Sequence, residues 1–446
     1  MSNSDSAGAQ HAFQGPALYA LLALLLAYIL SFIDRNVMAV LIGPIRDDFA
    51  ISDFQYSLLH GFAFSMFYIF LGLPIARMAD RGSRKWVVTA GVFCWSLMTC
   101  LCGVTRSFAG LFLARVGVGV GEAALSPPAY SLLSDYFSDD SLPRAMSIYT
   151  LGITIGGGLA YIIGSAVYEF FTLHGALLLP FFGQLRPWQT TFVVVGAPGF
   201  LVVLLLAMMA EPARRGIPAA GAEDYSLSEV RSHLHVHWQA YTSLILGVSL
   251  LAVLGYGTMA WYPEFLVRNH GMDRGEAGSA FGMIFIVAGS AGALIGGYSA
   301  RPLSNRGYVD ASMRLILWIS LLWLLPAALG PLSANSHIAL LAAVPIVFFL
   351  NSYFALAISA LQGITPNRMR AQVSALMLFM TNLLGLALGP SAVAAITDFV
   401  FADDAALAYS LTLLPLIVCP LAALLLAWGL KYYRTALLAS ATNAGA

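Results

Sequence analysis

Charged residues are scarce in this chain, because Asp, Glu, Lys and Arg together make up only 10% of its 446 residues. Soluble domains carry about 25% charged residues, so this composition excludes an ordinary water-soluble globular protein. Hydrophobic residues make up 59% of the chain, and its mean hydropathy is +0.80. The composition therefore predicts a protein that lies largely in lipid.

The chain also lacks an excess of basic charge and has few cysteines, and both features limit the partners and cross-links that we expect. There is no excess of basic charge, because 22 Lys and Arg residues balance 22 Asp and Glu residues. A nucleic-acid partner needs a clustered basic surface, so we expect none. Cysteines are few and lie in apolar runs, where they are expected to pack as free thiols without a disulfide or zinc: Cys94, Cys100, Cys102 and Cys419.

Catalytic and targeting motifs are missing as well. The sequence has no G-x-S-x-G nucleophile motif and no H-E-x-x-H zinc motif, which argues against a membrane enzyme. The polar N-terminal segment has no basic residue ahead of the first apolar run, so no cleaved signal peptide is expected. We therefore predict a protein that is not an enzyme and that has no metal site and no organic cofactor.

Long apolar runs are what the sequence has in abundance. A run of about 20 apolar residues is long enough to cross a bilayer as a helix. Twelve such runs are separated by charged or Gly/Pro-rich turns, at 17–43, 54–76, 86–105, 108–134, 143–170, 188–210, 238–266, 275–300, 311–332, 336–363, 369–397 and 405–430. The fold prediction is an all-α membrane protein with twelve transmembrane helices in two six-helix bundles.

The basic residues predict the orientation of these spans. Fifteen of the 22 Lys and Arg residues fall on the side of the connection between spans 2 and 3, five fall on the other side, and two lie inside spans. Basic loops stay in the cytoplasm. We therefore expect a multi-pass protein of the inner (plasma) membrane with both termini in the cytoplasm.

The longest polar connection divides the chain near its midpoint. Residues 211–237 mix helix breakers with charges and are expected to form a cytoplasmic linker between an N-terminal bundle, 1–210, and a C-terminal bundle, 238–446. His233, His235 and His237 alternate at the end of this linker. A metal site is one interpretation, but only His233 and His237 share a helix face, and a solvated linker end is the other.

The stretch 111–128 carries Arg115 and Glu122 inside an apolar run. Seven residues are two helical turns, so both side chains project from one face. Ionised groups at membrane depth are functional candidates by default. The intervening Gly117, Gly119 and Gly121 are expected to let neighbouring helices approach closely, since no strand precedes them as a dinucleotide-binding loop requires.

Span 1 contains a second pair of ionisable residues, Asp34 and Arg35. Asp34 and Arg115 lie at similar depths, roughly 10–12 Å from the outer end at 1.5 Å per residue, so we expect them to pair. Glu122 is then near the midplane. A buried acid whose proton affinity depends on a nearby arginine can couple proton movement to a conformational cycle, and a structural ion pair is the alternative. Arg35 either snorkels to the outer surface or has a functional role.

The second half offers no Asp, Lys or Arg at depth. A cavity with charged walls on one side and apolar, aromatic walls on the other suits a molecule with a polar head and an apolar tail, and ordinary helix packing is the alternative. The predicted substrate-binding residues are Arg35, Arg115, Glu122, Tyr256, Trp261, Asn351, Tyr353, Thr381 and Asn382.

The chain resembles the major facilitator superfamily along its whole length. The stretch 76–85, with the sequence ARMADRGSRK, is similar to that family's loop between helices 2 and 3. The resemblance implies that the charged residues of this loop form a gate that latches the two halves on the cytoplasmic side. These are Asp80, Arg81, Arg84 and Lys85.

Within that superfamily the first half resembles the Spinster family. The matching stretches are 32–35 (FIDR), the 76–85 loop, Arg115 with 117–123 (GVGVGEA), and 146–149 (MSIY) leading to 156–161 (GGGLAY). The resemblance implies proton-linked movement of lysophospholipids or sphingoid lipids, with Asp34, Arg115 and Glu122 as the coupling residues.

These observations predict a proton-coupled secondary transporter that moves an amphipathic lipid by alternating access, with protons as the coupling ion. The alternative in the same fold is a proton-linked transporter of small organic anions or drugs. Two halves of equal span number are typical of such transporters. The expected partners are the substrate and the membrane lipids, and a monomer is sufficient for this plan.

Overall fold

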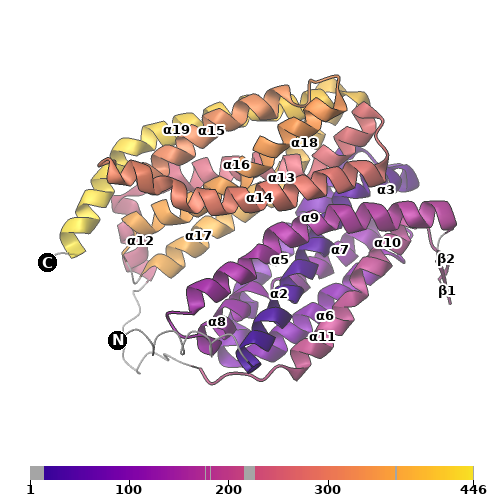
Figure 1. Ribbon diagram of the computed structural model, residues 1–446, viewed down its shortest axis with the longest axis horizontal. Coiled ribbons are helices and arrows are strands. Elements are labelled where there is room, and N and C mark those ends of the chain that lie inside the picture. Colours follow the sequence, from indigo (N-terminus) through magenta and orange to yellow (C-terminus); the bar gives the residue numbers. More distant parts are fainter. Residues whose placement is uncertain (1–14, 176, 181, 215–226, 367–368, 445–446) are drawn as a thin grey trace. The chain divides into compact units, whose positions relative to one another are not determined.

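The computed structural model describes residues 15–175, 177–180, 182–214, 227–366 and 369–444. In this part of the chain, twelve helical segments are long and apolar enough to cross a membrane. The predicted all-α membrane fold with twelve spans is therefore confirmed. The segments belong to two compact units, each of which contains helices packed side by side (Figure 1).

The first unit consists of Met1–Ile217 together with Asp273–Ile286. Its α2 packs against α9, and α7 packs against both α5 and α6. In chain order the elements are α2 (Gly15–Asn36), η1 (Val37–Val40), α3 (Ile42–Phe49), α4 (Asp53–Ser57), η2 (Leu58–Phe62), α5 (Ala63–Arg81), α6 (Arg84–Cys102), α7 (Phe108–Glu122), α8 (Ser126–Tyr136), α9 (Leu142–His174), β1 (Leu178–Leu179), β2 (Gly183–Gln184), α10 (Pro187–Gly196) and α11 (Pro198–Met208).

The second unit consists of Pro218–Met272 and Val287–Ala446. Here α13 packs against α19, and α15 packs against α16 and α19. The elements are α12 (Leu227–Val236), α13 (Trp238–His270), α14 (Arg274–Asn305, from Val287 onward), α15 (Ala311–Leu329), α16 (Ser336–Ile364), α17 (Arg370–Asn382), η4 (Leu383–Leu388), α18 (Gly389–Ala395), η5 (Ile396–Phe401), η6 (Asp404–Ala406) and α19 (Leu407–Ala444).

Several predicted spans are divided into shorter helices. The span expected over 108–134 consists of α7, which ends at Glu122, and α8, which begins at Ser126 with two prolines in its first turn. Proline fits the first turn because its missing N–H has no partner there in any helix. The same rule accounts for the start of α11 at Pro198 and of α18 with Pro390 near its start.

The boundary between the two units lies within the stretch 211–237 that was predicted as the linker, and the start of α14 groups with the first unit. Aromatic contacts account for this grouping, because the Tyr161 ring on α9 lies 5.0 Å from that of Phe281 and 6.0 Å from that of Phe285. Hydropathy gives the length of a span but not the bundle against which it packs.

The glycines of α7 act as the sequence predicts, by permitting close helix packing. A Cβ atom on Gly121 would lie 2.6 Å from the backbone nitrogen of Trp95 and 2.9 Å from the carbonyl oxygen of Gly91, both on α6. A Cβ atom on Gly119 would meet the backbone of Phe64 on α5. Since backbone atoms cannot move aside as a side-chain tip can, α7 needs glycine at these contacts.

A short hairpin, which the sequence did not suggest, follows α9. Strands β1 and β2 pair antiparallel, with Leu178 opposite Gln184 and Leu179 opposite Gly183 (Figure 1). Helix α9 has 33 residues, which corresponds to about 50 Å at 1.5 Å per residue. It is therefore longer than the roughly 30 Å hydrocarbon core of a bilayer, and the hairpin follows its C-terminal end.

Candidate functional site

Three ionisable side chains of the predicted site are almost completely buried inside the first unit. Asp34 on α2 is 2% exposed, Arg115 on α7 is 0% exposed, and Glu122 at the end of α7 is 2% exposed. Neither acid faces lipid. A charge in such a place must be compensated by a partner, so the contacts of each group indicate its role.

Glu122 forms an ion pair with Arg35. The Nη2 and Nε atoms of Arg35 lie 2.6 Å and 3.2 Å from the same carboxylate oxygen of Glu122, Oε2. The guanidinium also packs against the rings of Phe32, Phe64 and Tyr68, with centroid distances of 4.8, 4.6 and 5.2 Å. Arg35 thus points toward Glu122 rather than snorkelling to the outer surface.

Arg115 does not form the expected ion pair with the Asp34 carboxylate in the described part of the chain. Its Nη1 atom donates instead to the backbone carbonyl oxygen of Asp34, at 3.2 Å. The physical reason is that α2 ends at Asn36 and continues as a 3₁₀ turn, and carbonyl groups in the last turn of a helix lack intrahelical partners. The two residues lie at matching depths and are in contact. The arginine, however, donates to the backbone carbonyl of Asp34 and not to its carboxylate.

Several buried polar atoms around this contact have no hydrogen-bond partner among the described residues. Among the described residues, the Nε and Nη2 atoms of Arg115, the Oδ1 atom of Asp34 and the Oε1 atom of Glu122 are buried and have no hydrogen-bond partner. Buried polar groups are nearly always paired in folded proteins. Unsatisfied donors and acceptors within one cluster therefore mark it as a candidate ligand site.

Two further residues of the first unit have unpartnered polar atoms and were not among the predicted site residues. The Nδ1 atom of His60, in the π-helical turn η2, and the hydroxyl oxygen of Tyr149, on α9, are buried and without a partner among the described residues. The Tyr149 ring stacks on Tyr28 at 4.4 Å and meets Tyr130 edge-on at 5.6 Å. A histidine within an apolar span was the available sequence signal for His60.

The predicted substrate-binding residues of the second unit have mixed surroundings. Trp261 is 1% exposed and its indole N–H donates to the carbonyl oxygen of Pro390 at 2.9 Å. The buried Tyr353 packs near Trp323, and Asn351 donates to Val347 of its own helix. This geometry favours the packing alternative for Trp261 and Tyr353.

Each of the remaining predicted residues of this unit has either an unpartnered polar atom or a partly exposed side chain. Thr381 is buried, and its hydroxyl oxygen has no hydrogen-bond partner within the described residues. Tyr256 and Asn382 are partly exposed. These three side chains and the partly exposed Asn351, rather than Trp261, are the members of the set whose surroundings leave room for a ligand contact.

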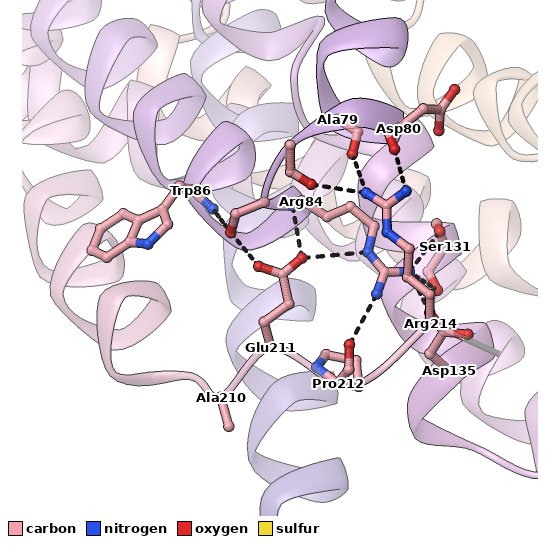
Figure 2. Close-up of polar contacts among 12 residues, drawn as sticks. Ala79, Asp80, Arg84, Trp86, Ser131, Asp135, Ala210, Glu211, Pro212 and Arg214 are labelled. Carbon is pink, nitrogen blue, oxygen red and sulfur yellow. Dashed lines mark hydrogen bonds and ion pairs between the residues drawn. The ribbon is translucent and has the colours of Figure 1, made fainter.

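A second polar cluster lies at the loop between α5 and α6 and is centred on Arg84 (Figure 2). The Arg84 guanidinium, which is 2% exposed, forms an ion pair with Asp135 on α8 and donates to the hydroxyl oxygen of Ser131 at 2.9 Å. Its backbone N–H donates to Glu211 Oε1 at 2.8 Å. Ser83 also donates to Glu211.

Arg214 completes this cluster from the beginning of the linker. Its guanidinium donates to three backbone carbonyl oxygens at the end of α5, those of Ala79 at 2.7 Å, Gly82 at 2.8 Å and Asp80 (Figure 2). Terminal carbonyls of a helix are acceptors without helical partners, so the arginine caps α5 while Glu211 caps the start of α6. The first residues of the predicted linker are thus attached to the first unit.

The four predicted gate residues differ in their surroundings. Arg84 is buried and its guanidinium contacts Asp135 and Ser131 within the first unit, whereas Asp80 and Arg81 are exposed. Lys85 is partly exposed and its Nζ atom lies 4.9 Å from the centre of the Trp86 ring. Arg84 therefore serves to fix the loop, while the other three charges remain at the surface.

The Glu211 carboxylate should make stability depend on pH. Burial opposes its ionisation, but hydrogen bonds from Ser83 and Arg84 outweigh that effect and hold the pKa of Glu211 below its ordinary value. A depressed folded pKa gives stability that is present above the unfolded pKa, about 4.3, and lost as the pH falls through the folded pKa. We expect Glu211→Gln to lower the apparent Tm at pH 7 by about 2 °C.

The measurement is the apparent Tm of both proteins between pH 3.5 and pH 8. The difference between them should be constant above about pH 5 and should vanish at the acidic end. Equal Tm values at pH 7 would show that the contacts of Glu211 contribute nothing.

The second unit has a comparable buried acid, Asp310, which directly precedes the span Ala311–Leu329. Asp310, which is 1% exposed, accepts from Arg434 on α19 at 2.8 Å and from Arg314 at 3.0 Å. Burial opposes its ionisation, but the two arginines outweigh this and lower the pKa of Asp310. This acid connects the start of α15 to α19.

The linker histidines take part in packing. The Nε2 atom of His233 lies 3.0 Å from the hydroxyl oxygen of Tyr241, which donates in turn to the carbonyl oxygen of Ile364 at 3.0 Å. His233 and His237 are in ring contact at 5.2 Å. This arrangement favours a structural role for His233 over the metal-binding alternative.

The sequence and the fold are similar to those of known proteins. Residues 24–390 match the Major Facilitator Superfamily. The chain is 29% identical over 419 residues to a Mycolicibacterium smegmatis protein named MFS-type efflux pump, covering 93% of this chain and 91% of that protein. It is 26% identical over 385 residues to Protein spinster of Drosophila melanogaster, covering 83% of this chain but only 60% of the Drosophila protein.

A solved structure extends this similarity to the whole fold. It is the crystal structure of a bacterial homologue of the human lysosomal transporter Spinster, in an inward-facing and unoccupied conformation. The two chains superpose with a TM-score of 0.78 at 27% sequence identity, and the alignment covers 95% of this chain and 97% of the other.

Proposed function

This chain belongs to the Major Facilitator Superfamily, whose members are transporters and not enzymes, and we propose that it is a proton-coupled secondary transporter of an amphipathic lipid. The substrate class is a lysophospholipid or a sphingoid-type lipid, and transport proceeds by alternating access. Protons are the coupling ion, and no other cofactor is required. The protein works in the inner (plasma) membrane with both termini in the cytoplasm, and a monomer suffices.

The buried cluster of Asp34, Arg115 and Glu122 is the observation that carries this proposal. Glu122 holds Arg35 through one carboxylate oxygen while the other is unpartnered. Protonation of Glu122 removes the charge that attracts Arg35, so the pair weakens. A ligand with a negative group then competes for the guanidinium. Proton binding and substrate binding thereby act on the same ion pair, which is the physical requirement for coupling.

Asp34 and Arg115 have a supporting role in this scheme. Arg115 keeps two unpartnered nitrogen atoms next to Asp34, whose carboxylate also retains an unpartnered oxygen. A phosphate or carboxylate group of the substrate is the natural partner for a guanidinium with free donors. A change in the protonation of Asp34 alters the field at Arg115 and therefore its affinity for that anion.

The lipid assignment rests on what surrounds these charges. Arg35 lies among the rings of Phe32, Phe64 and Tyr68, and Tyr28 stacks on Tyr149 nearby. Sites that combine a few convergent polar groups with an aromatic wall suit ligands with a charged head and an apolar body. The similarity to Protein spinster and to the bacterial Spinster homologue supports a transporter of the Spinster type.

The runner-up function is proton-linked transport of small organic anions or drugs. The similarity to a protein named MFS-type efflux pump favours it, and the guanidiniums of Arg35 and Arg115 suit any anion. The surface charges of Asp80, Arg81 and Lys85, with Arg84 holding their loop, form the cytoplasmic gate in either case.

A competition experiment separates the two functions. Purified protein in proteoliposomes is given a radiolabelled lysophospholipid under an imposed pH gradient, and unlabelled competitors are added. We expect unlabelled lysophospholipid to suppress uptake, collapse of the pH gradient to abolish it, and short carboxylates at the same concentration to leave it unchanged. Suppression by the carboxylates alone would favour the runner-up, and uptake independent of the gradient would contradict proton coupling.

A further inference from the structure

The second unit contains a groove at its linker end that none of the predicted site residues lines. It has a volume of about 440 Å³, within the range of small-molecule sites. Three helices form its walls. Helix α12 contributes Arg231, Leu234 and His235 at intervals of three and four residues, so these side chains share one face.

The deeper part of the groove is lined mainly by apolar side chains. Trp238, Thr242 and Ile245 project into it from one face of α13, and Leu376 and Met380 from one face of α17. Leu376 and Trp238 are 39% and 48% exposed, so the groove opens on the surface of the unit. Inside a membrane, such a surface groove is filled by lipid chains.

The aromatic side chains at the mouth indicate where the groove lies in the bilayer. The Trp238 ring is 5.9 Å from that of Trp428 on α19, and Trp428 is 5.4 Å from Tyr432. Tryptophan and tyrosine gather at the boundary between headgroups and hydrocarbon. Ile245 follows Trp238 by seven residues and is therefore about 10 Å deeper along the helix, whereas Arg231 and His235 precede Trp238 on the polar side.

The charge distribution along the groove matches one class of molecule. Its polar end carries two basic residues and no acid, and both basic side chains are exposed. Within the described residues neither Arg231 nor His235 has an acidic partner. Basic pockets between transmembrane helices at headgroup depth attract anionic lipids, and guanidinium fits phosphate with paired hydrogen bonds.

We propose that this groove binds an anionic phospholipid of the leaflet on the linker side, with its phosphate at Arg231 and one acyl chain along Trp238 and Ile245. The wall that would hold the lipid is already fixed. His233 on α12 contacts the hydroxyl of Tyr241, and Tyr241 donates to Ile364 at the end of α16. The lipid joins α12, α13 and α17 and is a resident component of the second unit, distinct from the transported molecule.

Quenching of Trp238 fluorescence tests this proposal. Purified full-length protein in detergent micelles is titrated with phosphatidylglycerol or phosphatidylcholine carrying brominated acyl chains, which quench nearby tryptophan. The chain has 8 tryptophans, so the contribution of Trp238 is the part of the quenching that disappears in Trp238→Phe. We expect that part to show about fivefold tighter binding of phosphatidylglycerol, since one basic residue at a membrane surface contributes about that factor.

Three variants assign the binding to the groove. Arg231→Gln should reduce the affinity for phosphatidylglycerol to that for phosphatidylcholine. Thr242→Phe places a ring in the groove and should remove the Trp238-dependent quenching by both lipids. Arg306→Gln, which changes another exposed arginine outside the groove, should behave as the unaltered chain does.

Several outcomes would overturn the proposal. Equal quenching of Trp238 by the two lipids would show an ordinary lipid annulus, and an equal loss in Arg306→Gln would show a general effect of charge. Displacement of phosphatidylglycerol by millimolar inorganic phosphate would show an anion site without a lipid chain. Binding is measured here without transport, so its failure is distinguishable from failure of the proposed transport function.

Discussion

Replacing Glu122 with glutamine is expected to abolish pH-driven uptake in proteoliposomes while leaving substrate exchange intact. Glutamine has nearly the same shape but cannot be ionised, so the pair with Arg35 loses its charge and no proton is taken up at this position. Exchange of internal for external substrate needs no net proton movement. Uphill accumulation should fall to the level of empty vesicles, and Asp34→Asn should act in the same direction.

The matched control is Asp310→Asn. This change also neutralises a buried acid that is paired with arginines, but at a position outside the spans of the second unit. It should cost stability and leave the dependence of uptake on the pH gradient unchanged. Size-exclusion profiles and apparent Tm values of all three variants separate folding from coupling.

Two results would contradict the coupling role of Glu122. Gradient-driven uptake at the normal rate in Glu122→Gln would show that the ion pair with Arg35 is structural, as the alternative interpretation holds. Loss of exchange together with uptake, in a variant that folds, would assign Glu122 to substrate binding instead.

The second large effect is expected from Gly121→Ala. The added methyl group would lie 2.6 Å from the backbone nitrogen of Trp95 and 2.9 Å from the carbonyl oxygen of Gly91, so α6 and α7 must separate. Overpacking of this kind costs roughly 1–3 kcal/mol, which corresponds to an apparent Tm lower by about 2 to 12 °C. The separation should also displace Glu122, the next residue, and reduce uptake.

Gly72→Ala is the matched control for this change. A Cβ atom at Gly72 on α5 meets nothing within 4 Å, and alanine is the better helix former by about 1 kcal/mol. Its apparent Tm should equal or exceed that of the unaltered chain. If Gly121→Ala were equally stable, the close approach of α6 and α7 would not be what requires glycine there.

The number and approximate position of the spans follow from hydropathy, because a helix in lipid must be apolar along its length. Their internal breaks do not follow. The π-helical turns η2, η4 and η5 and the 3₁₀ turn η1 interrupt apolar sequences that carry no local signal beyond scattered glycine and proline. Such turns depend on packing against neighbouring helices.

The sequence predicts which residues form the candidate site, but it does not predict which of these residues pair with one another. Burial of Asp34, Arg115 and Glu122 follows from their presence inside apolar runs. The choice of partner depends on the rotation of α2 and α7 about their axes, which tertiary packing sets. That rotation brings Arg35 to Glu122 and leaves Arg115 with a backbone carbonyl. The sequence therefore indicates the charges and not their contacts.

The contacts of Glu211 and Arg214 with the loop between α5 and α6 have a practical consequence for splitting the protein. Both residues hold backbone groups of the first unit, and α12 is tied to α13 through His233 and Tyr241. An engineered protease site or fluorescent tag is best tolerated where no hydrogen-bonded backbone is disturbed. Insertion after Arg214 and before α12 keeps both anchors, whereas insertion ahead of Glu211 would remove a cap from α6.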